Sequence, residues 1–152
     1  MMKRNCLLIS FTIFVFFLSS CKNDTLEPSG YDLEILDAVN AHRNKLGLRT
    51  LEHDDFIWKL AREHSEYMAN AASNANHDGI DERYTKISEH FGIGTHGENV
   101  SSGEGTAAQV LAAWLGSVSH KETLEGNFKL TGLSAVKAED GTWYYTQIFF
   151  NQ

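Results

Sequence analysis

The most regular pattern of hydrophobic and polar positions runs over residues 55–72. Apolar side chains recur there at the spacing of one helix face, and Asp54 stands before them as an N-cap. The face consists of Ile57, Leu60, Ala61, His64, Met68 and Ala71. The pattern predicts an amphipathic helix over 55–72. It places His64 on the apolar side, where a hydrogen-bonded core histidine is commoner than a metal ligand.

Weaker helical patterns cover residues 31–47 and 81–91, and Gly47 ends the first of them. Arg43 falls on the inner face of the first helix, so we expect its head group to bind carbonyls or a carboxylate. A further helix opens at Thr106, which with Gln109 forms a capping box. Its apolar side is formed by Val110, Leu111, Trp114 and Val118.

The end of the chain changes from a helical to an extended pattern. Residues 129–139 and 142–150 are β-rich runs separated by Asp140 and Gly141, which predicts a hairpin. Helices first and strands last indicate an α+β fold, with helices covering a small antiparallel sheet.

The first twenty residues differ from this pattern. Lys3 and Arg4 precede an apolar run too short for a comfortable membrane span, which is typical of a secretory signal. The run ends in Leu-Ser-Ser-Cys at Cys21, which resembles the lipobox of bacterial lipoproteins. This resemblance implies cleavage before Cys21 and acyl chains such as palmitate on that cysteine. An ordinary signal peptide followed by a chance cysteine is the alternative.

The lipobox sets the organisation that we expect: signal peptide 1–20, flexible tether 21–30, one domain 31–152. No cysteine is then left to form a disulfide, so the domain must depend on its core. Loss of Lys3 and Arg4 takes the formal charge from −7 to −9, which argues against nucleic acid as a partner. We expect a monomer in the bacterial cell envelope, periplasmic or on the cell surface, held at the membrane by the acyl chains of Cys21.

Three polar residues stand outside the apolar stripes. His77 lies in the turn-rich stretch ASNANHDG, Glu98 follows Gly97, and His120 lies just past the stripe that contains Trp114. Two histidines and a carboxylate match a catalytic zinc site with one open position. They would equally form a hydrogen-bonded cluster at the edge of a cleft, and the chain contains no His-Glu-x-x-His motif. Both interpretations stay open from the residues alone.

A nucleophile is hard to find. No free thiol survives processing, and Ser117 and Ser119 lie near His120 without a Gly-x-Ser-x-Gly elbow.

Residues 31–150 resemble the CAP superfamily (cysteine-rich secretory proteins, antigen 5, pathogenesis-related 1), in its bacterial, cysteine-poor branch. The similar pieces, in family order, are Asn40-x-x-Arg43 with Gly47 and Leu51, Leu60-Ala61-x-x-His64-x-x-x-Met68, His77, Gly97-Glu98-Asn99-Val100, Trp114-x-x-Ser117-x-x-His120, and Tyr145-Thr146-Gln147 with Phe149. The resemblance implies a three-layer α-β-α sandwich around a three-stranded antiparallel sheet. It also implies a cleft that holds His77 and Glu98.

The chain departs from the family pattern at two cleft positions. Eukaryotic members complete a His-Glu-Glu-His set, whereas Ser117 and Tyr144 occupy two of those places here. His120, typical of the bacterial form, stands near the missing second histidine. We expect His77, Glu98 and His120 to converge on one cleft, with Tyr144 or Gln147 at its edge.

The incomplete set and the missing nucleophile favour a binding module over an enzyme. Its cleft would hold a small apolar, glycan or protein ligand. A zinc-assisted hydrolase of envelope peptides or esters, with His77, Glu98 and His120 as ligands or catalytic groups, is one alternative. A purely structural surface protein is the other.

Overall fold

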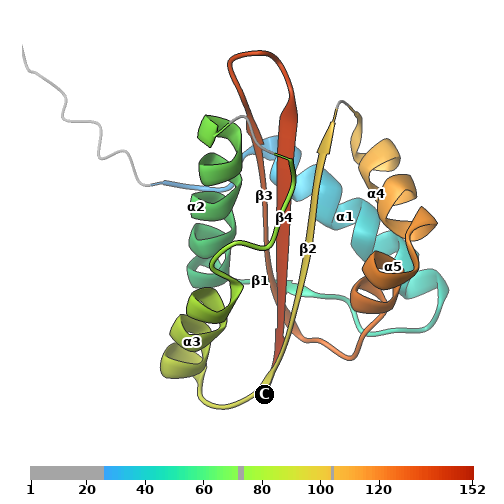
Figure 1. Cartoon of the computed structure of the whole chain (residues 1–152). Helices are drawn as coiled ribbons and strands as arrows, with labels where there is room; N and C mark the ends of the chain where they lie inside the picture. The colour runs from blue at the N-terminus through green and yellow to red at the C-terminus, as the bar shows by residue number, and fades with distance from the viewer. Residues whose placement is uncertain (1–25, 72–73, 104) are drawn as a thin grey trace, which may run out of the picture.

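The computed structural model describes residues 26–71, 74–103 and 105–152 (Figure 1). Its elements are α1 (Gly30–Lys45), β1 (Glu52–His53), α2 (Asp55–Ala71), α3 (Ile80–Phe91), β2 (Thr95–Gly103), α4 (Ala107–Gly116), α5 (Val118–Leu124), β3 (Leu130–Lys137) and β4 (Trp143–Asn151). The signal segment and Cys21 lie outside the described residues. Among the residues described, no helix has the length and apolar character needed to cross a membrane.

The sheet has four strands in the order β1-β3-β4-β2. β3 and β4 form the predicted hairpin, and β2 pairs antiparallel with β4 over its whole length. The two-residue β1 adds a parallel edge beside β3, held by Glu52 N–H donating to Lys129 O and Asp54 N–H donating to Thr131 O. The prediction of an α+β sandwich is confirmed, but the sheet is mixed and four-stranded rather than three-stranded and antiparallel.

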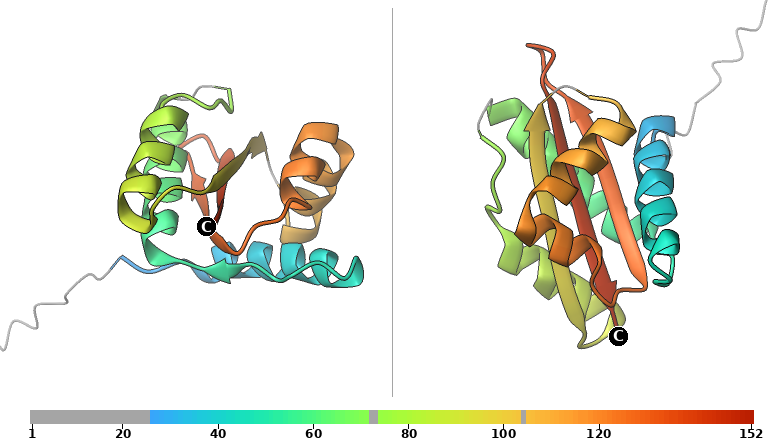
Figure 2. Two further views of the ribbon diagram at one scale, coloured as in Figure 1. Left: turned by 90° about the horizontal axis from the view of Figure 1, so that it is seen from below. Right: turned by 90° about the vertical axis from the view of Figure 1, so that its right-hand side faces the viewer.

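Two helical layers enclose the sheet (Figure 2). α2 and α3 cover one face, where Ile148 and Phe150 of β4 join their core. α1, α4 and α5 cover the other face, which receives Tyr145 and Phe149. Alternate side chains of β4 therefore pack against opposite helical layers, as the two-residue period of a strand requires.

Trp114 confirms the predicted core position, with no exposed surface and its indole N–H donating to Ser101 Oγ. The placement of Val118 on the same stripe is wrong, because Val118 is 75% exposed. α4 ends at Gly116, and Ser117 adopts an extended backbone before α5 begins. The break turns the chain, so the helical period does not continue from Trp114 to Val118.

Arg43 satisfies the expectation of buried carbonyl partners. It is 1% exposed and donates to the backbone oxygens of Arg49, Leu124 and Gly126. These bonds tie α1 to the segment that follows it, to the end of α5 and to the loop before β3.

Candidate functional site

Glu98 lies at the centre of a buried polar network on β2. It stands opposite Ile148 in the sheet, so its side chain faces the layer of α2 and α3. That side chain has no exposed surface. A buried carboxylate needs charged or hydrogen-bonding partners, since loss of hydration otherwise costs several kcal/mol.

Arg83 of α3 supplies the opposite charge. Its Nε donates to Glu98 Oε2 at 2.7 Å, and its Nη2 donates to Glu98 Oε1 at 2.7 Å. This two-point geometry is the strong form of a guanidinium–carboxylate pair. Arg83 also donates from Nη1 to the backbone oxygen of Asp78, so one side chain joins α3, β2 and the loop before α3.

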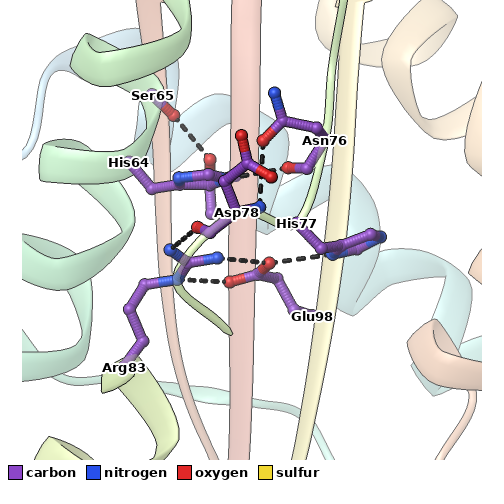
Figure 3. Close-up of polar contacts among 8 residues, drawn as sticks. His64, Ser65, Asn76, His77, Asp78, Arg83 and Glu98 are labelled. Atoms are coloured by element: carbon purple, nitrogen blue, oxygen red, sulfur yellow. Dashed lines mark hydrogen bonds and ion pairs between the residues drawn. The ribbon is translucent and has the colours of Figure 1, made fainter. Parts of the chain in front are cut away.

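His77 completes the network from that loop. Its Nδ1 lies 2.9 Å from Glu98 Oε1 and donates to it, because an ionised carboxylate can only accept. Its side chain is 46% exposed, so the ring has one edge on the buried network and the rest open to solvent. Figure 3 shows Glu98 held between Arg83 and His77.

The loop that carries His77 is held from both ends. His64 of α2 donates from Nε2 to Asn76 O at 2.8 Å, and Arg83 of α3 donates to Asp78 O, two residues further along (Figure 3). The Asn76 side chain accepts from the backbone N–H of Asp78. His64 is the core histidine that the helical stripe predicted, and its role is to fix the loop that positions His77. Burial lowers the pKa of His64, which keeps its ring neutral.

His120 approaches the site from α5, on the opposite layer. Its backbone oxygen accepts from Asn99 Nδ2 at 2.9 Å, and Asn99 is the residue after Glu98 on β2. Burial lowers the pKa of the half-buried His120 ring, and the charge of His77 lowers it further. In the described part of the chain, no hydrogen bond joins this ring to His77 or Glu98. The structure therefore bonds His77 to Glu98 and leaves the His120 ring outside their network.

Tyr144 and Gln147 point to opposite sides of β4. Tyr144 packs against Met68 and Val100 in the α2 layer. Gln147 has no exposed surface and donates from Nε2 to Thr131 Oγ1 on the other face. Neither side chain touches the His77–Glu98 network through a hydrogen bond that the described residues show.

The geometry does not fit a zinc site of His77, Glu98 and His120. Both oxygens of Glu98 accept from Arg83, and one of them also accepts from the only ring nitrogen of His77 that faces it. Across the described ranges, no three His, Cys, Asp or Glu side chains are placed to hold a metal ion.

Comparison with known proteins identifies the family of the chain. The model of the cysteine-rich secretory protein family, CAP, matches residues 36–149. The chain belongs to the CAP family. The matched range contains α2, α3, β2, α4 and α5, and so includes the whole network around Glu98.

CAP relatives in bacteria share this domain. The chain is 31% identical over 113 residues to the uncharacterized protein YkwD of Bacillus subtilis (strain 168), a match that covers 72% of this chain and 44% of YkwD. The chain thus spans less than half of that relative.

Solved CAP structures superpose well. An outer surface protein from Borrelia burgdorferi gives a TM-score of 0.70 at 26% identity, covering 83% of this chain and 96% of that one. An extracellular protein from Bacillus anthracis str. Ames that contains an SCP domain gives 0.68 at 25% identity, covering 81% and 41%. The venom allergen-like protein 4 of Schistosoma mansoni, at 13% identity and a TM-score of 0.57, shares the fold alone.

Sequence reasoning missed Arg83, the residue that neutralises Glu98. The sequence could have indicated that Arg83 is buried, because Arg83 stands one helical turn before Ile87 on the inner face of α3. A charged residue on an apolar stripe requires a buried partner, and Glu98 is that partner. Only the tertiary structure identifies it, since the two residues lie on different elements.

Proposed function

We propose that this protein is a lipid-anchored binding module of the bacterial cell envelope and that it has no hydrolytic activity. The anchor would be Cys21, and the ligand site would lie around His77 and His120. Location outside the cytoplasm is supported by the secretory signal and by two relatives described as an outer surface protein and an extracellular protein.

The buried and paired carboxylate of Glu98 is the observation that supports this proposal most directly. A general base needs a lone pair aimed at the reacting proton, within hydrogen-bond reach. The Glu98 oxygens face Arg83 and His77 and have no exposed surface. Proton abstraction would require the ion pair to break, so Glu98 acts here as a support for the His77 ring.

The exposed part of the site suits recognition by hydrogen bonds. With Nδ1–H donated to Glu98, the His77 ring presents Nε2 on a half-exposed side chain, where it accepts a hydrogen bond if the ring is neutral and donates one if the ring is protonated. The neutral His120 ring, half-buried on α5, supplies a second group of the same kind. Two imidazole rings that each form hydrogen bonds favour a ligand that presents hydroxyl or amide groups, such as a glycan, over a purely apolar one.

A titration followed by NMR tests the binding function. We expect tri-N-acetylchitotriose to shift the amide signals around His77 and His120, and His77→Ala to abolish those shifts while leaving the remaining spectrum intact. Palmitate serves as the apolar comparison. Shifts that palmitate alone produces, or that persist in His77→Ala, would contradict a polar site at this position.

A turnover assay tests the enzymatic alternative. Casein and p-nitrophenyl acetate are incubated with the protein, with and without added Zn²⁺, beside metal analysis of wild type and His77→Ala. We expect no rate above that of His77→Ala and no bound zinc that depends on His77. Hydrolysis that is lost in both His77→Ala and Glu98→Gln would establish an enzyme.

A further inference from the structure

The two edges of the sheet differ in how their backbone groups are used. β1 pairs with part of the outer edge of β3, and Asp32 Oδ1 accepts from the N–H of Ala135 further along that edge. The opposite edge is β2, which runs for nine residues in constant register against β4. Residues 95–103 include no Lys, no Pro and no bulge, the features that usually keep an edge strand from pairing further.

The register of the sheet identifies the outward-facing groups of β2. Thr131 O accepts from Asp54 N–H, so Thr131, like Ala135, faces away from β4. The even-numbered residues of β3 therefore bond to even-numbered residues of β4, which leaves the odd-numbered residues of β4 to bond to odd-numbered residues of β2. The residues of β2 whose backbone groups face outward are His96, Glu98, Val100 and Ser102.

These outward backbone groups are unpaired, and the central ones are almost buried. In the part of the chain that the structure describes, no hydrogen bond reaches the N–H or the C=O of the four residues. Glu98 and Val100 are only 7% and 5% exposed. The Glu98 side chain has no exposed surface, so the accessible part of Glu98 is main chain. Backbone groups with so little contact with water are nearly always paired in folded proteins, which indicates a missing partner.

His77 and His120 stand on the two sides of this edge. The His77 ring bonds to Glu98 from the layer of α2 and α3, and Figure 3 shows it beside β2. The backbone oxygen of His120 accepts from Asn99 on the layer of α5. The two histidines are close enough for the charge of His77 to lower the pKa of His120. The unpaired edge therefore lies within the site proposed around these two residues.

We propose that the outer edge of β2 binds an extended peptide segment of another protein, which adds a fifth strand to the sheet. An added strand offers N–H donors and C=O acceptors at the same two-residue spacing as the outward groups of β2. The hydroxyl groups of a glycan do not repeat at that spacing. A second copy of this chain fits less well, because each copy has a formal charge of −7 and would bring its own helical layers against those that flank the edge (Figure 2).

The peptide site rests on the proposed function, since it lies between His77 and His120 and narrows the ligand to a peptide. The probe is the soluble heptapeptide acetyl-Lys-Thr-Val-Thr-Val-Thr-Lys-amide, whose β-branched residues favour extension and whose lysines suit an acidic protein. The control is the same heptapeptide with every backbone nitrogen methylated. It keeps the side chains and loses the N–H donors.

Hydrogen exchange followed by NMR on the whole protein provides the measurement. In the free protein, the amides of Glu98 and Val100 should exchange faster than those of Gly97 and Asn99, which bond to β4. We expect the heptapeptide to slow exchange at Glu98 and Val100 about tenfold when its concentration is about ten times its Kd. The methylated peptide should leave this exchange unchanged.

Ser102→Pro is the matching variant of the protein. It removes an outward N–H from an exposed residue without taking a bond from β4, so the fold should persist. Loss of one backbone hydrogen bond should weaken peptide binding by at least about fivefold. Ser102→Ala keeps the N–H and should leave peptide binding unchanged. Neither variant should change the shifts produced by tri-N-acetylchitotriose, so the peptide test and the glycan test can fail separately.

Unchanged exchange at Glu98 and Val100 in millimolar heptapeptide would overturn the peptide site, even if the glycan binds. Equal protection by the methylated peptide, or equal weakening by Ser102→Ala, would also overturn it, because the contact would then not depend on backbone groups. A dimer in sedimentation that Ser102→Pro dissociates would assign the edge to a second copy instead. Protection by the heptapeptide without glycan binding would support the peptide site and refute the preference for a glycan.

Discussion

Arg83 and Glu98 pair face to face between α3 and β2 through two hydrogen bonds of 2.7 Å. Their side chains are 9% and 0% exposed. The pair connects the helix layer to an edge strand of the sheet, and its carboxylate also accepts the hydrogen bond that orients His77. The structure of this region therefore depends on one buried contact between opposite charges.

Glu98→Ala should destabilise the protein by about 3–5 kcal/mol, because Arg83 would remain buried without its counter-charge. The measurement is urea unfolding. Glu66→Gln is the control, because it removes a carboxylate from the exposed Arg62–Glu66 pair and should change stability by no more than about 0.5 kcal/mol. Equal effects of the two substitutions would show that the Arg83–Glu98 pair contributes no more than a surface pair does.

Trp114→Ala should cost about 3–5 kcal/mol, since it removes a fully buried indole from the core between α4 and the sheet. Trp114→Phe keeps much of the volume and loses the bond to Ser101 Oγ, so its cost should be smaller. Thermal unfolding measures both. A shift of only a degree or two for Trp114→Ala would contradict the burial of this side chain.

Gly132→Ala should destabilise the protein by at least about 2 kcal/mol. A Cβ on Gly132 would overlap the backbone of Ile57 and Trp58, so α2 would have to move away from β3. Gly116→Ala is the matched control, because a Cβ there meets nothing within 4 Å and alanine favours the helix. If both variants unfold at the same denaturant concentration, the close approach of α2 to β3 is not as described.

Stability should fall as the pH is lowered from about 7.5 to about 5. Burial lowers the pKa values of His64, His96 and His120 below the ordinary 6.5. As the pH falls, the unfolded chain therefore binds protons at a higher pH than the folded chain does, which favours unfolding. The contribution of these neutral histidines to the free energy of unfolding is complete above pH 6.5 and is lost as the pH falls through their lowered pKa values. His64→Gln should reduce the slope, since His64 is 3% exposed and an amide can still donate to Asn76 O. Urea unfolding across this range that gives the same slope in both proteins would exclude His64 as a source.

Cys21→Ser should release the protein from membranes if the lipobox is used. Unprocessed or soluble protein is the expected result, with loss of detergent phase partitioning. Cys6→Ser is the control, because Cys6 lies within the predicted signal segment and should leave anchoring unchanged. Membrane association that survives Cys21→Ser would refute the lipoprotein prediction.

Local patterns in the sequence determined most of the elements. The 3.6-residue stripe of α2, the capping box of Thr106 and Gln109, and the hairpin around Asp140-Gly141 are all present as predicted. Each of these signals lies within a short stretch of chain, so the residues that specify the element are the residues that form it. The expectation that His77 and Glu98 meet came instead from the family resemblance, because the two residues lie on different elements.

Only the tertiary structure decided which strands pair and which residue neutralises Glu98. The glycine-rich stretch around Glu98 has a weak local preference for extension, yet it forms a strand of nine residues because β4 offers a complete ladder of backbone groups. β1 exists only because two residues meet β3. Arg83 stands on the inner face of α3, and its pairing with Glu98 follows from the approach of α3 to β2, which no local pattern encodes. The physical reason is that burial of charge is a property of the assembled layers, so sequence can show that a partner is needed but not which residue provides it.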